Sequence, residues 1–456
     1  MALTDERLRA LTRKRAVLAT SLEAWLDQTA DVTTRRDPAF QIHYVQTRDV
    51  DRLMGGIRRL VDQALARTVD AGAVAQRGAT LEAAILAGCE VWEFFRGKLA
   101  QRLDGSLRTF LRVGDELAWQ CYRPVRNLAH PGSDPVAKAP PLVYLNSTWS
   151  PFTVTRDRAF EVSAVPQAFL RNADFRSALS RLPFPVIAVP WYQTAYLPDA
   201  VSICHEVGHS VEADFGLTDQ IAGRIATVVP DSAAREAWVA RGSELFADFH
   251  GCLSVGPAYA WALANILLTD ATGAVAAHPS YPPLAARMAF NAAVIEAMGF
   301  AAESAEFVRA CEEAFPPGAA AADAESARAI GAAFVGTGGE PGITVGGARL
   351  AGAFGFTAAQ QDEAAADAQD LVGGGEAASA EIRVLCAAAV LASRQPRFTA
   401  QDRLLATMRA ACVDERRNAE AARPGSGDAG REAHLAGVGE ALAGEMLGDL
   451  AVGLDG

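Results

Sequence analysis

The chain lacks a hydrophobic run long enough to cross a bilayer, and it lacks an apolar leader at its start. The longest apolar stretch, Ala258–Leu268, is shorter than the roughly 20 residues that a membrane-spanning helix needs. Charged residues such as Asp5, Arg9 and Lys14 interrupt the first 30 residues, so no secretory signal is predicted. We therefore expect a soluble, cytoplasmic protein without a membrane partner.

Cysteine is scarce, and basic residues are not concentrated in any one region. The seven cysteines are odd in number and scattered over 456 residues, without a Cys-x-x-Cys pair. This pattern argues against a disulfide framework and against a zinc site made of cysteines. The net charge is −12, and no basic stripe with interleaved aromatic residues occurs. A nucleic-acid partner is therefore not expected.

Five consecutive residues carry most of the chemical information in the chain. His205, Glu206 and His209 form the pattern H-E-x-x-H inside Ala200–Leu217, a segment with the composition of a buried helix. Residues four apart lie on one face of a helix, so both imidazoles can bind one metal ion. Glu206 follows the first imidazole, where it can take a proton from a water that the metal activates. The pattern predicts a Zn2+ site with Glu206 as the general base.

A third metal ligand is expected further along the chain, because catalytic zinc usually takes three protein ligands and keeps one position for water. One class of zinc proteins has a histidine six residues after the second one, but Phe215 stands at that position. A later predicted helix carries Glu244 and Asp248 four residues apart. We predict that Glu244 binds the metal. We also predict that Asp248 accepts the free ring N–H of His205 and raises its basicity.

The pattern H-E-x-x-H followed by Glu-x-x-x-Asp resembles that of the gluzincins, the thermolysin-like zinc metallopeptidases. The matching residues are His205, Glu206, His209, Glu244 and Asp248. The resemblance covers less than half of the chain, from a strand at Phe184 to the helix after Arg287. It implies a mostly helical α+β fold, with a zincin-like catalytic domain around a small mixed sheet and a peptide or protein substrate. No Gly-x-Met-Glu-Asn stretch precedes the pattern, which argues against the aminopeptidase branch.

The segment His278–Arg287 is the best candidate for groups that act on the substrate. It combines His278, Tyr281 and Arg287 with three prolines, which stiffen the loop. We predict that His278 or Tyr281 donates to the oxyanion formed when water adds to the scissile carbonyl. We also predict that Arg287 binds a substrate carbonyl or carboxylate. The alternative is a rigid turn before the next helix, with Arg287 in a surface pair.

Four residues near these motifs have weaker assignments. Tyr192 and Tyr196 can line the cleft, although half-buried aromatic residues belong more often to a core. His250 lies off the metal-facing stripe of its helix and is interpreted as structural. Glu212 is interpreted either as a partner behind a metal ligand or as an ordinary solvated residue.

Hydrophobic periodicity divides the chain into three expected domains. Residues 1–130 form a predicted helical N-terminal domain, because apolar residues recur there at helical spacing. Residues 131–315 form the zincin-like metallopeptidase domain, and residues 316–456 form an Ala/Gly-rich helical C-terminal region. The flanking helical regions are expected to gate, inhibit or support the cleft, with a regulatory protein partner as one option.

Short strands are predicted in the middle domain. They are Leu142–Leu145, Val162–Val165 and Val186–Val189, and together they would form the small sheet above the metal helix. Proline-bounded Phe184–Pro190 is expected to be the edge strand that holds an extended peptide by main-chain hydrogen bonds. Leu107–Tyr122 is compatible with strands or with a bent helix.

These observations predict zinc-dependent hydrolysis of peptide bonds, with three alternatives. A non-catalytic interaction protein would keep a structural zinc closed by a fourth protein ligand, for which Asp214 and His250 are the candidates. A zinc hydrolase of non-peptide amides would use the same metal chemistry. A zincin fold that binds metal without turnover is the third alternative.

Overall fold

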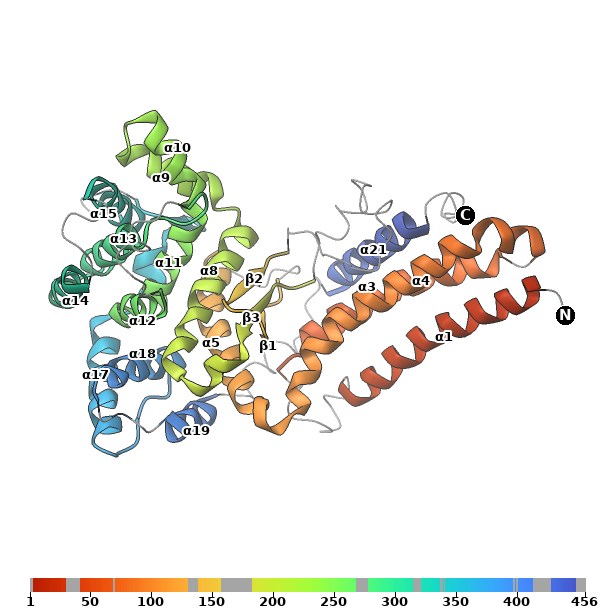
Figure 1. Ribbon diagram of the computed structural model, residues 1–456, viewed down its shortest axis with the longest axis horizontal. Helices are drawn as coiled ribbons and strands as arrows, with labels where there is room; N and C mark the ends of the chain where they lie inside the picture. The colour runs from red at the N-terminus through yellow and green to blue at the C-terminus, as the bar shows by residue number, and fades with distance from the viewer. Residues whose placement is uncertain are drawn as a thin grey trace.

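The computed structural model shows a mostly helical molecule with two small sheets in its described part. It describes residues 3–29, 42–68, 70–129, 138–156, 183–267, 278–314, 321–336, 339, 341–396, 398, 401–412 and 428–447. Figure 1 shows an elongated arrangement, with long helices at one end and a larger body of shorter helices at the other. The predicted class, a mostly helical α+β fold with a small mixed sheet, is confirmed.

The helical end, which we call the bundle, contains segments from both halves of the chain. It is formed by α1 (Leu3–Thr29), α3 (Tyr44–Ala66), α4 (Ala71–Ala100) and α21 (Asp428–Leu447). α21 lies against α3 (Figure 1). Two glycines allow this close approach, because a Cβ on Gly56 would lie 2.2 Å from the carbonyl oxygen of Ala436, and one on Gly439 would lie 2.0 Å from that of Leu53.

A three-stranded mixed sheet lies between the bundle and the body. Its strands are β1 (Leu142–Asn146), β2 (Phe152–Val154) and β3 (Val186–Pro190), in the order β1-β3-β2. β3 is parallel to β1 and antiparallel to β2. The strands predicted around residues 142–145 and 186–189 are therefore confirmed, and the one predicted at 162–165 lies outside the described residues.

The position of the edge strand differs from the prediction. The expectation that Phe184–Pro190 forms the edge is wrong, because β3 is central and fully buried. Among the described strands, the edge next to the H-E-x-x-H helix is β2, which pairs there with β3 alone. A three-residue strand is too short to show the alternation by which strands are recognised in a sequence.

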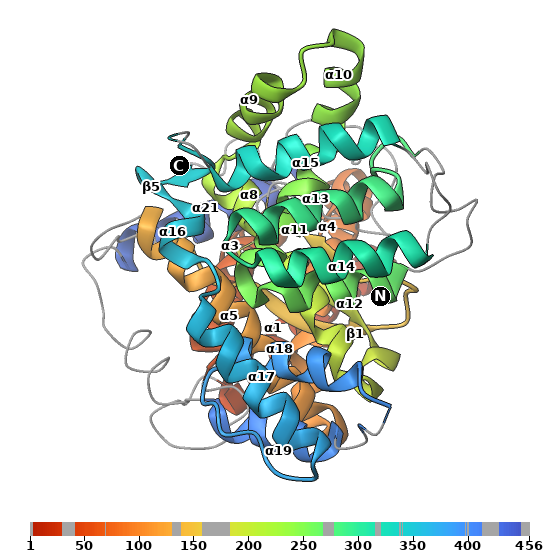
Figure 2. The same ribbon diagram turned by 90° about the vertical axis from the view of Figure 1, so that its left-hand side faces the viewer.

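The body is built from many short helices around the H-E-x-x-H helix. In chain order they are η1 (Gln101–Leu103), α5 (Gly105–Ala129), η2 (Trp191–Ala195), η3 (Leu197–Val201), α8 (Ser202–Phe215), α9 (Thr218–Val228), α10 (Ser232–Ala240), α11 (Gly242–Val255), α12 (Pro257–Leu267), α13 (Leu284–Ala297), α14 (Ala301–Ala314), α15 (Ala321–Val335), α16 (Leu350–Phe354), α17 (Ala358–Val372), α18 (Ile382–Ser393) and α19 (Gln401–Ala411). A hairpin of β4 (Thr344–Val345) and β5 (Ala348–Arg349) precedes α16. Figure 2 shows α13, α14 and α15 side by side on the outer face of the body.

Two hydrophobic clusters hold the molecule together. The larger cluster runs from Phe110 in α5 to Cys412 after α19 and includes the buried face of α8. The smaller one fills the bundle and includes Leu142 and Val186 of the sheet. The predicted boundaries at residues 130 and 315 do not coincide with the division between these clusters, because α5, α18 and α19 share the core of α8. No described helix is both long enough and apolar enough to span a membrane.

Candidate metal site and cleft

The site begins with a close crossing of α8 and α11. A Cβ on Gly208 would lie 2.7 Å from the Cα of Ala247, a separation that real side chains do not adopt, so glycine is required at this crossing. Gly216 caps the end of α8 with a φ of 63°, in the left-handed region that glycine adopts readily. The crossing brings the two histidines of α8 against the first turn of α11, where Glu244 lies.

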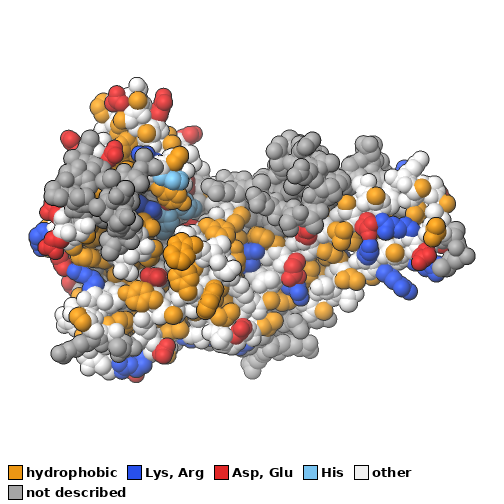
Figure 3. All heavy atoms as spheres, in the orientation of Figure 1, with side chains coloured by type: hydrophobic (Ala, Val, Ile, Leu, Met, Phe, Trp, Pro, Cys, Tyr) orange, Lys and Arg blue, Asp and Glu red, His pale blue; other side chains and the backbone are white. Residues whose placement is uncertain are grey.

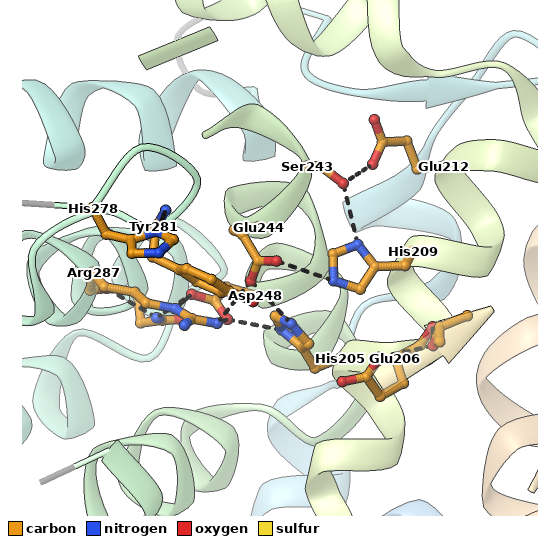
Figure 4. Close-up of polar contacts among 12 residues, drawn as sticks. His205, Glu206, His209, Glu212, Ser243, Glu244, Asp248, His278, Tyr281 and Arg287 are labelled. Carbon is orange, nitrogen blue, oxygen red and sulfur yellow. Dashed lines mark hydrogen bonds and ion pairs between the residues drawn. The ribbon is translucent and has the colours of Figure 1, made fainter. Parts of the chain in front are cut away.

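Three side chains converge at this crossing, as Figure 4 shows. His205 Nε2 lies 3.4 Å from Glu244 Oε2, and His209 Nε2 lies 3.5 Å from Glu244 Oε1. Three possible ligand atoms of these residues all lie within 4.8 Å of one another. Zinc bound at about 2.0–2.1 Å by a tetrahedral ligand set would separate its ligand atoms by roughly 3.4 Å. The spacing therefore suits a single zinc ion.

The hydrogen bonding of Glu244 also fits a cation. Its Oε2 atom is buried and accepts no hydrogen bond from the described residues. Arg287 Nη2 is the nearest cationic nitrogen outside the two imidazoles, at 3.5 Å. A buried carboxylate oxygen without a donor is costly unless a cation compensates it, so the residues present fit a divalent metal.

The ring of His205 is held with its Nε2 atom toward Glu244 Oε2. Its Nδ1 lies 3.0 Å from Asp248 Oδ1 and 3.0 Å from the hydroxyl oxygen of Tyr259. The Tyr259 hydroxyl donates to Asp248 at 2.6 Å, so both neighbouring oxygens accept from the ring, and Nδ1 carries the hydrogen. Burial lowers the pKa of His205, but hydrogen bonds and charges of Asp248 and Glu244 outweigh burial and raise it to about 10. When His205 loses this proton, the negative charges of Asp248 and Glu244 stabilise a metal cation in its place.

Asp248 is itself held by a buried arginine. Arg287 donates from Nε to Oδ2 at 2.5 Å and from Nη2 to Oδ1 at 2.8 Å. Burial alone would raise the pKa of Asp248, but Arg287 and His205 outweigh it and hold that pKa well below its usual range. The alternative that Arg287 makes a surface pair is wrong, because it is only 6% exposed. Two of its nitrogens are engaged within the protein.

The ring of His209 is backed by a carboxylate through a hydroxyl group. Its Nδ1 lies 3.1 Å from Ser243 Oγ, which donates to Glu212 Oε2 at 2.5 Å. Thr218 donates to the other Glu212 oxygen at 3.0 Å. Glu212 is therefore buried behind a candidate ligand and is not an ordinary solvated residue. Sequence reasoning missed Ser243, although it directly precedes Glu244.

The candidate base Glu206 lies next to the edge strand. Thr153 of β2 donates to Glu206 Oε2 at 2.7 Å and lies 2.9 Å from its carbonyl oxygen. Burial is the main cause that raises the pKa of Glu206 above its usual value. Figure 4 shows its side chain on the β2 side of α8, beside His205. No sequence signal marks Thr153, because its role depends on where β2 packs.

The loop before α13 brings His278 and Tyr281 to the cleft. His278 Nδ1 accepts the backbone N–H groups of Ser280 and Tyr281 at 3.1 and 3.3 Å. The neutral ring therefore carries its hydrogen on Nε2, which makes that nitrogen a donor. The rings of His278 and Tyr281 lie 4.9 Å apart, and Arg241 donates to the carbonyl oxygen of His278.

Other residues considered from the sequence lie away from the metal site. Tyr192 and Tyr196 are not among the described residues that line the cleft, but the ring of Tyr192 lies beside that of Trp149, next to the lining residue Ser150. His250 is buried, with its Nδ1 2.9 Å from the Cys204 carbonyl oxygen, in a structural position. Asp214 accepts hydrogen bonds from Tyr122 and Arg156.

The candidate ligands lie in a cleft of about 1000 Å³ that Glu206, His278, Tyr281 and Arg287 also line. Figure 3 shows histidine side chains reaching the surface of the body, with hydrophobic side chains beside them. The comparisons with known proteins found no matching family model, no matching curated protein and no matching solved structure. The geometry of this cleft is therefore the basis on which a function can be assigned.

Proposed function

We propose that this protein is a zinc-dependent peptidase of the gluzincin type, with a zincin-like catalytic domain formed by α8, α11 and the sheet. One observation carries the proposal. Two imidazoles and one carboxylate from crossing helices converge at the spacing that a tetrahedral zinc site needs, in the wall of an open cleft. His205, His209 and Glu244 would hold the ion, and a fourth position would be left for solvent.

The catalytic chemistry is divided between the ion and Glu206. Bound zinc would polarise a water molecule and the substrate carbonyl. Glu206 takes a proton from the water as it attacks, and it then passes this proton to the leaving amine. Burial raises the pKa of Glu206 and so helps it to hold the proton between the two transfers. The hydroxyl of Thr153 keeps the carboxylate in place.

The oxyanion donor is assigned to His278 in preference to Tyr281. Two backbone N–H groups occupy His278 Nδ1 and leave Nε2–H as the donor, so the ring needs no change of tautomer to act. Tyr281 packs against this ring at 4.9 Å and limits its rotation. Arg287 positions Asp248 and Glu244, because its Nε and Nη2 atoms are directed at them.

Two observations favour a peptidase over the alternatives. A closed structural site needs a fourth protein ligand, but both predicted candidates, Asp214 and His250, have other partners. The described residues offer one cluster of three ligands. Since β2 pairs only with β3 in the described structure, its other edge can hold an extended peptide by main-chain hydrogen bonds. A small non-peptide amide would not need such an edge.

A comparison of zinc content and peptide cleavage tests the proposal. Wild-type protein loaded with zinc should cleave members of a mixed peptide library, with the cleaved bonds identified by mass spectrometry. Glu206→Gln should keep one zinc per chain and lose at least about 100-fold in rate, because the proton carrier is gone. Glu244→Gln should lose zinc affinity as well. Stoichiometric zinc without any cleavage by the wild type, or undiminished cleavage by Glu206→Gln, would contradict the proposal.

A further inference from the structure

The walls of the cleft carry almost no charge apart from the metal site. Four described lining residues have charged carboxylate or guanidinium groups, and they are Glu206, Glu212, Glu244 and Arg287. Each of them is engaged with the candidate metal site or with a group that holds a ligand. Charged residues make up 21% of the chain, so the neutrality of the remaining lining is a specific feature of this cleft.

Apolar side chains form much of the remaining lining. One group comes from the start of β2, the residue before it and the end of η3, and it comprises Pro151, Phe152 and Val201. Another group comes from α12, from the loop before α13 and from the first residue of α13, and it comprises Leu263, Ile266, Leu267, Tyr281, Pro282 and Leu284. A charged substrate side chain placed among these groups would lose water without gaining a partner. An apolar side chain would gain burial instead.

Exposed aromatic side chains continue this apolar lining at the end of the cleft near β2. We call Trp149, Phe152, Trp191 and Tyr192 the aromatic rim, and they are 88%, 37%, 61% and 44% exposed. Phe152 and Ser150, the residue after Trp149, line the cleft itself. The other five tryptophans of the chain are buried or half-buried. Both exposed tryptophans follow the neighbouring ends of β1 and β3, where Asn146 pairs with Pro190.

The rim is held in a defined arrangement although it faces solvent. The Tyr192 hydroxyl donates to the Trp149 carbonyl oxygen at 2.8 Å. The two rings lie 6.2 Å apart and are tilted by 43°. This fixes the turn before β2 to the turn after β3. An ordered, exposed aromatic surface of this kind is typical of a binding site.

The segments around the rim lack charged residues even at exposed positions, where burial does not exclude them. Ala139–Thr155 and Pro183–Pro198 contain no Asp, Glu, Lys or Arg. The buried strands explain part of this, but Trp149 and Trp191 lie in exposed turns, where charged residues are normally frequent. The exposed part of these segments is therefore suited to an uncharged, apolar partner.

We propose that the cleft selects polypeptide segments with bulky apolar side chains next to the cleaved bond, and that the aromatic rim takes one aromatic or long aliphatic side chain of the same segment. This inference rests on the proposed function, because the occupant of the rim is the substrate that lies across the metal site. Acidic and basic segments are disfavoured, since the described walls offer their charges no free counter-charge.

Peptide binding to an inactive, zinc-loaded protein tests the inference. Glu206→Gln protein is titrated by calorimetry with two peptides that differ only at the centre, Phe-Leu-Phe in one and Glu-Ser-Glu in the other. The apolar peptide should bind at least about tenfold more tightly, the scale on which apolar pockets discriminate. Adding Trp149→Ala should reduce this preference about fivefold or more. Adding Leu86→Ala, which removes another exposed apolar side chain far away on α4, should leave it unchanged.

The outcomes separate this inference from the proposed function. Equal binding of both peptides, tighter binding of the acidic one, or no effect of Trp149→Ala would overturn the apolar selection. The apolar selection would also be overturned if sedimentation showed a dimer of the chain that Trp149→Ala abolishes, because a second copy would then occupy the rim. If wild-type protein cleaves both peptides equally, the peptidase function stands and the selection fails. If it cleaves neither but the rim-dependent preference is found, the selection stands and the peptidase function fails.

Discussion

At the scale of single residues, each candidate ligand imidazole has a carboxylate behind it. Asp248 acts on His205 directly, whereas Glu212 acts on His209 through Ser243. A serine has one hydroxyl hydrogen, and Ser243 gives it to Glu212, so its oxygen accepts the Nδ1–H of His209. Both rings therefore direct Nε2 at the metal position, and this nitrogen becomes the ligand atom once a metal replaces any proton on it.

Removing the Ser243 hydroxyl should weaken zinc binding. Ser243→Ala leaves His209 Nδ1 without its acceptor, so we expect zinc affinity to fall about 10–100-fold, measured by competition with a chelator. The matched control is Ser393→Ala, which removes a hydroxyl bonded within α18 and should not change zinc affinity. Unchanged zinc binding by Ser243→Ala would show that the ring needs no such support.

The sequence revealed those site residues whose spacing lies within one helix. His205 and His209 could be paired because they are one turn apart, and Glu244 and Asp248 have the same separation. Thr153 could not be found in this way, because its contact with Glu206 depends on the packing of β2 against α8. Tyr259 and Ser243 were likewise missed, since their partners lie on other helices.

At the scale of elements, the crossing of α8 and α11 sets the distance between the histidines and Glu244. Gly208 makes this possible, because its missing side chain leaves room for the backbone of Ala247. The crossing is a tertiary feature, and the sequence indicates it only by a glycine inside an otherwise regular helix. Ligand geometry and helix packing are therefore coupled at one residue.

A methyl group at this crossing should separate the helices. Gly208→Ala is expected to cost about 1–3 kcal/mol in the free energy of unfolding, as overpacking does, and to weaken zinc binding as well. Gly223→Ala in α9 is the control, because its Cβ meets nothing within 4 Å, and alanine there should be neutral or stabilising by about 0.5–1 kcal/mol. Urea unfolding and zinc titration of both variants provide the measurement. Normal stability and zinc affinity of Gly208→Ala would refute the packing argument.

Secondary structure was hardest to predict from the sequence where charged residues are buried. The segment Leu107–Tyr122 lies inside α5, one helix that continues past Pro124. Its apolar period is interrupted by Arg112, Asp115 and Glu116, which are all buried, so the pattern did not distinguish a helix from strands. Asp115 is buried because it pairs with Arg102, a contact between segments that periodicity cannot show.

At the scale of the whole molecule, a buried polar network joins the bundle to the body. Arg102 donates from Nε to His43 Nε2 at 2.9 Å and from Nη2 to Asp115 at 2.7 Å. Asp115 also accepts the backbone N–H of Val143 in β1 at 3.1 Å. His43 Nδ1 lies 2.9 Å from Gln46, an arrangement that needs a neutral ring. The domain boundaries expected from the sequence missed this junction, because its members are far apart in the chain.

Two buried neutral histidines should make the protein less stable in mild acid. Burial lowers the pKa of His43 and lowers that of His250 to about 4. Below about pH 6.5 the unfolded chain protonates both residues while the folded protein does not, so stability falls as the pH falls. Between pH 6.5 and 5 His250 contributes a loss of about 1.5 kcal/mol, and His43 adds to this loss in the same direction. Denaturant unfolding of the metal-free protein is the measurement, since His205, with a pKa of about 10, stays protonated there.

The variant His250→Asn distinguishes this cause from a general acid effect. It should be less stable than the wild type at pH 8, because the ring and its hydrogen bond to the Cys204 carbonyl oxygen are lost. Its stability should, however, decline less steeply between pH 6.5 and 5. An identical slope in the two proteins would mean that His250 does not remain neutral in the folded state.

The central claim is an open zinc site made of two imidazoles and one carboxylate, and X-ray absorption at the zinc edge of the loaded protein tests it most directly. We expect one zinc per chain, nitrogen and oxygen neighbours at about 2.0–2.1 Å with the scattering of two imidazoles, and no sulfur. Glu244→Ala should change this ligand set. Zinc that binds substoichiometrically, through sulfur, or with four protein ligands would contradict the account.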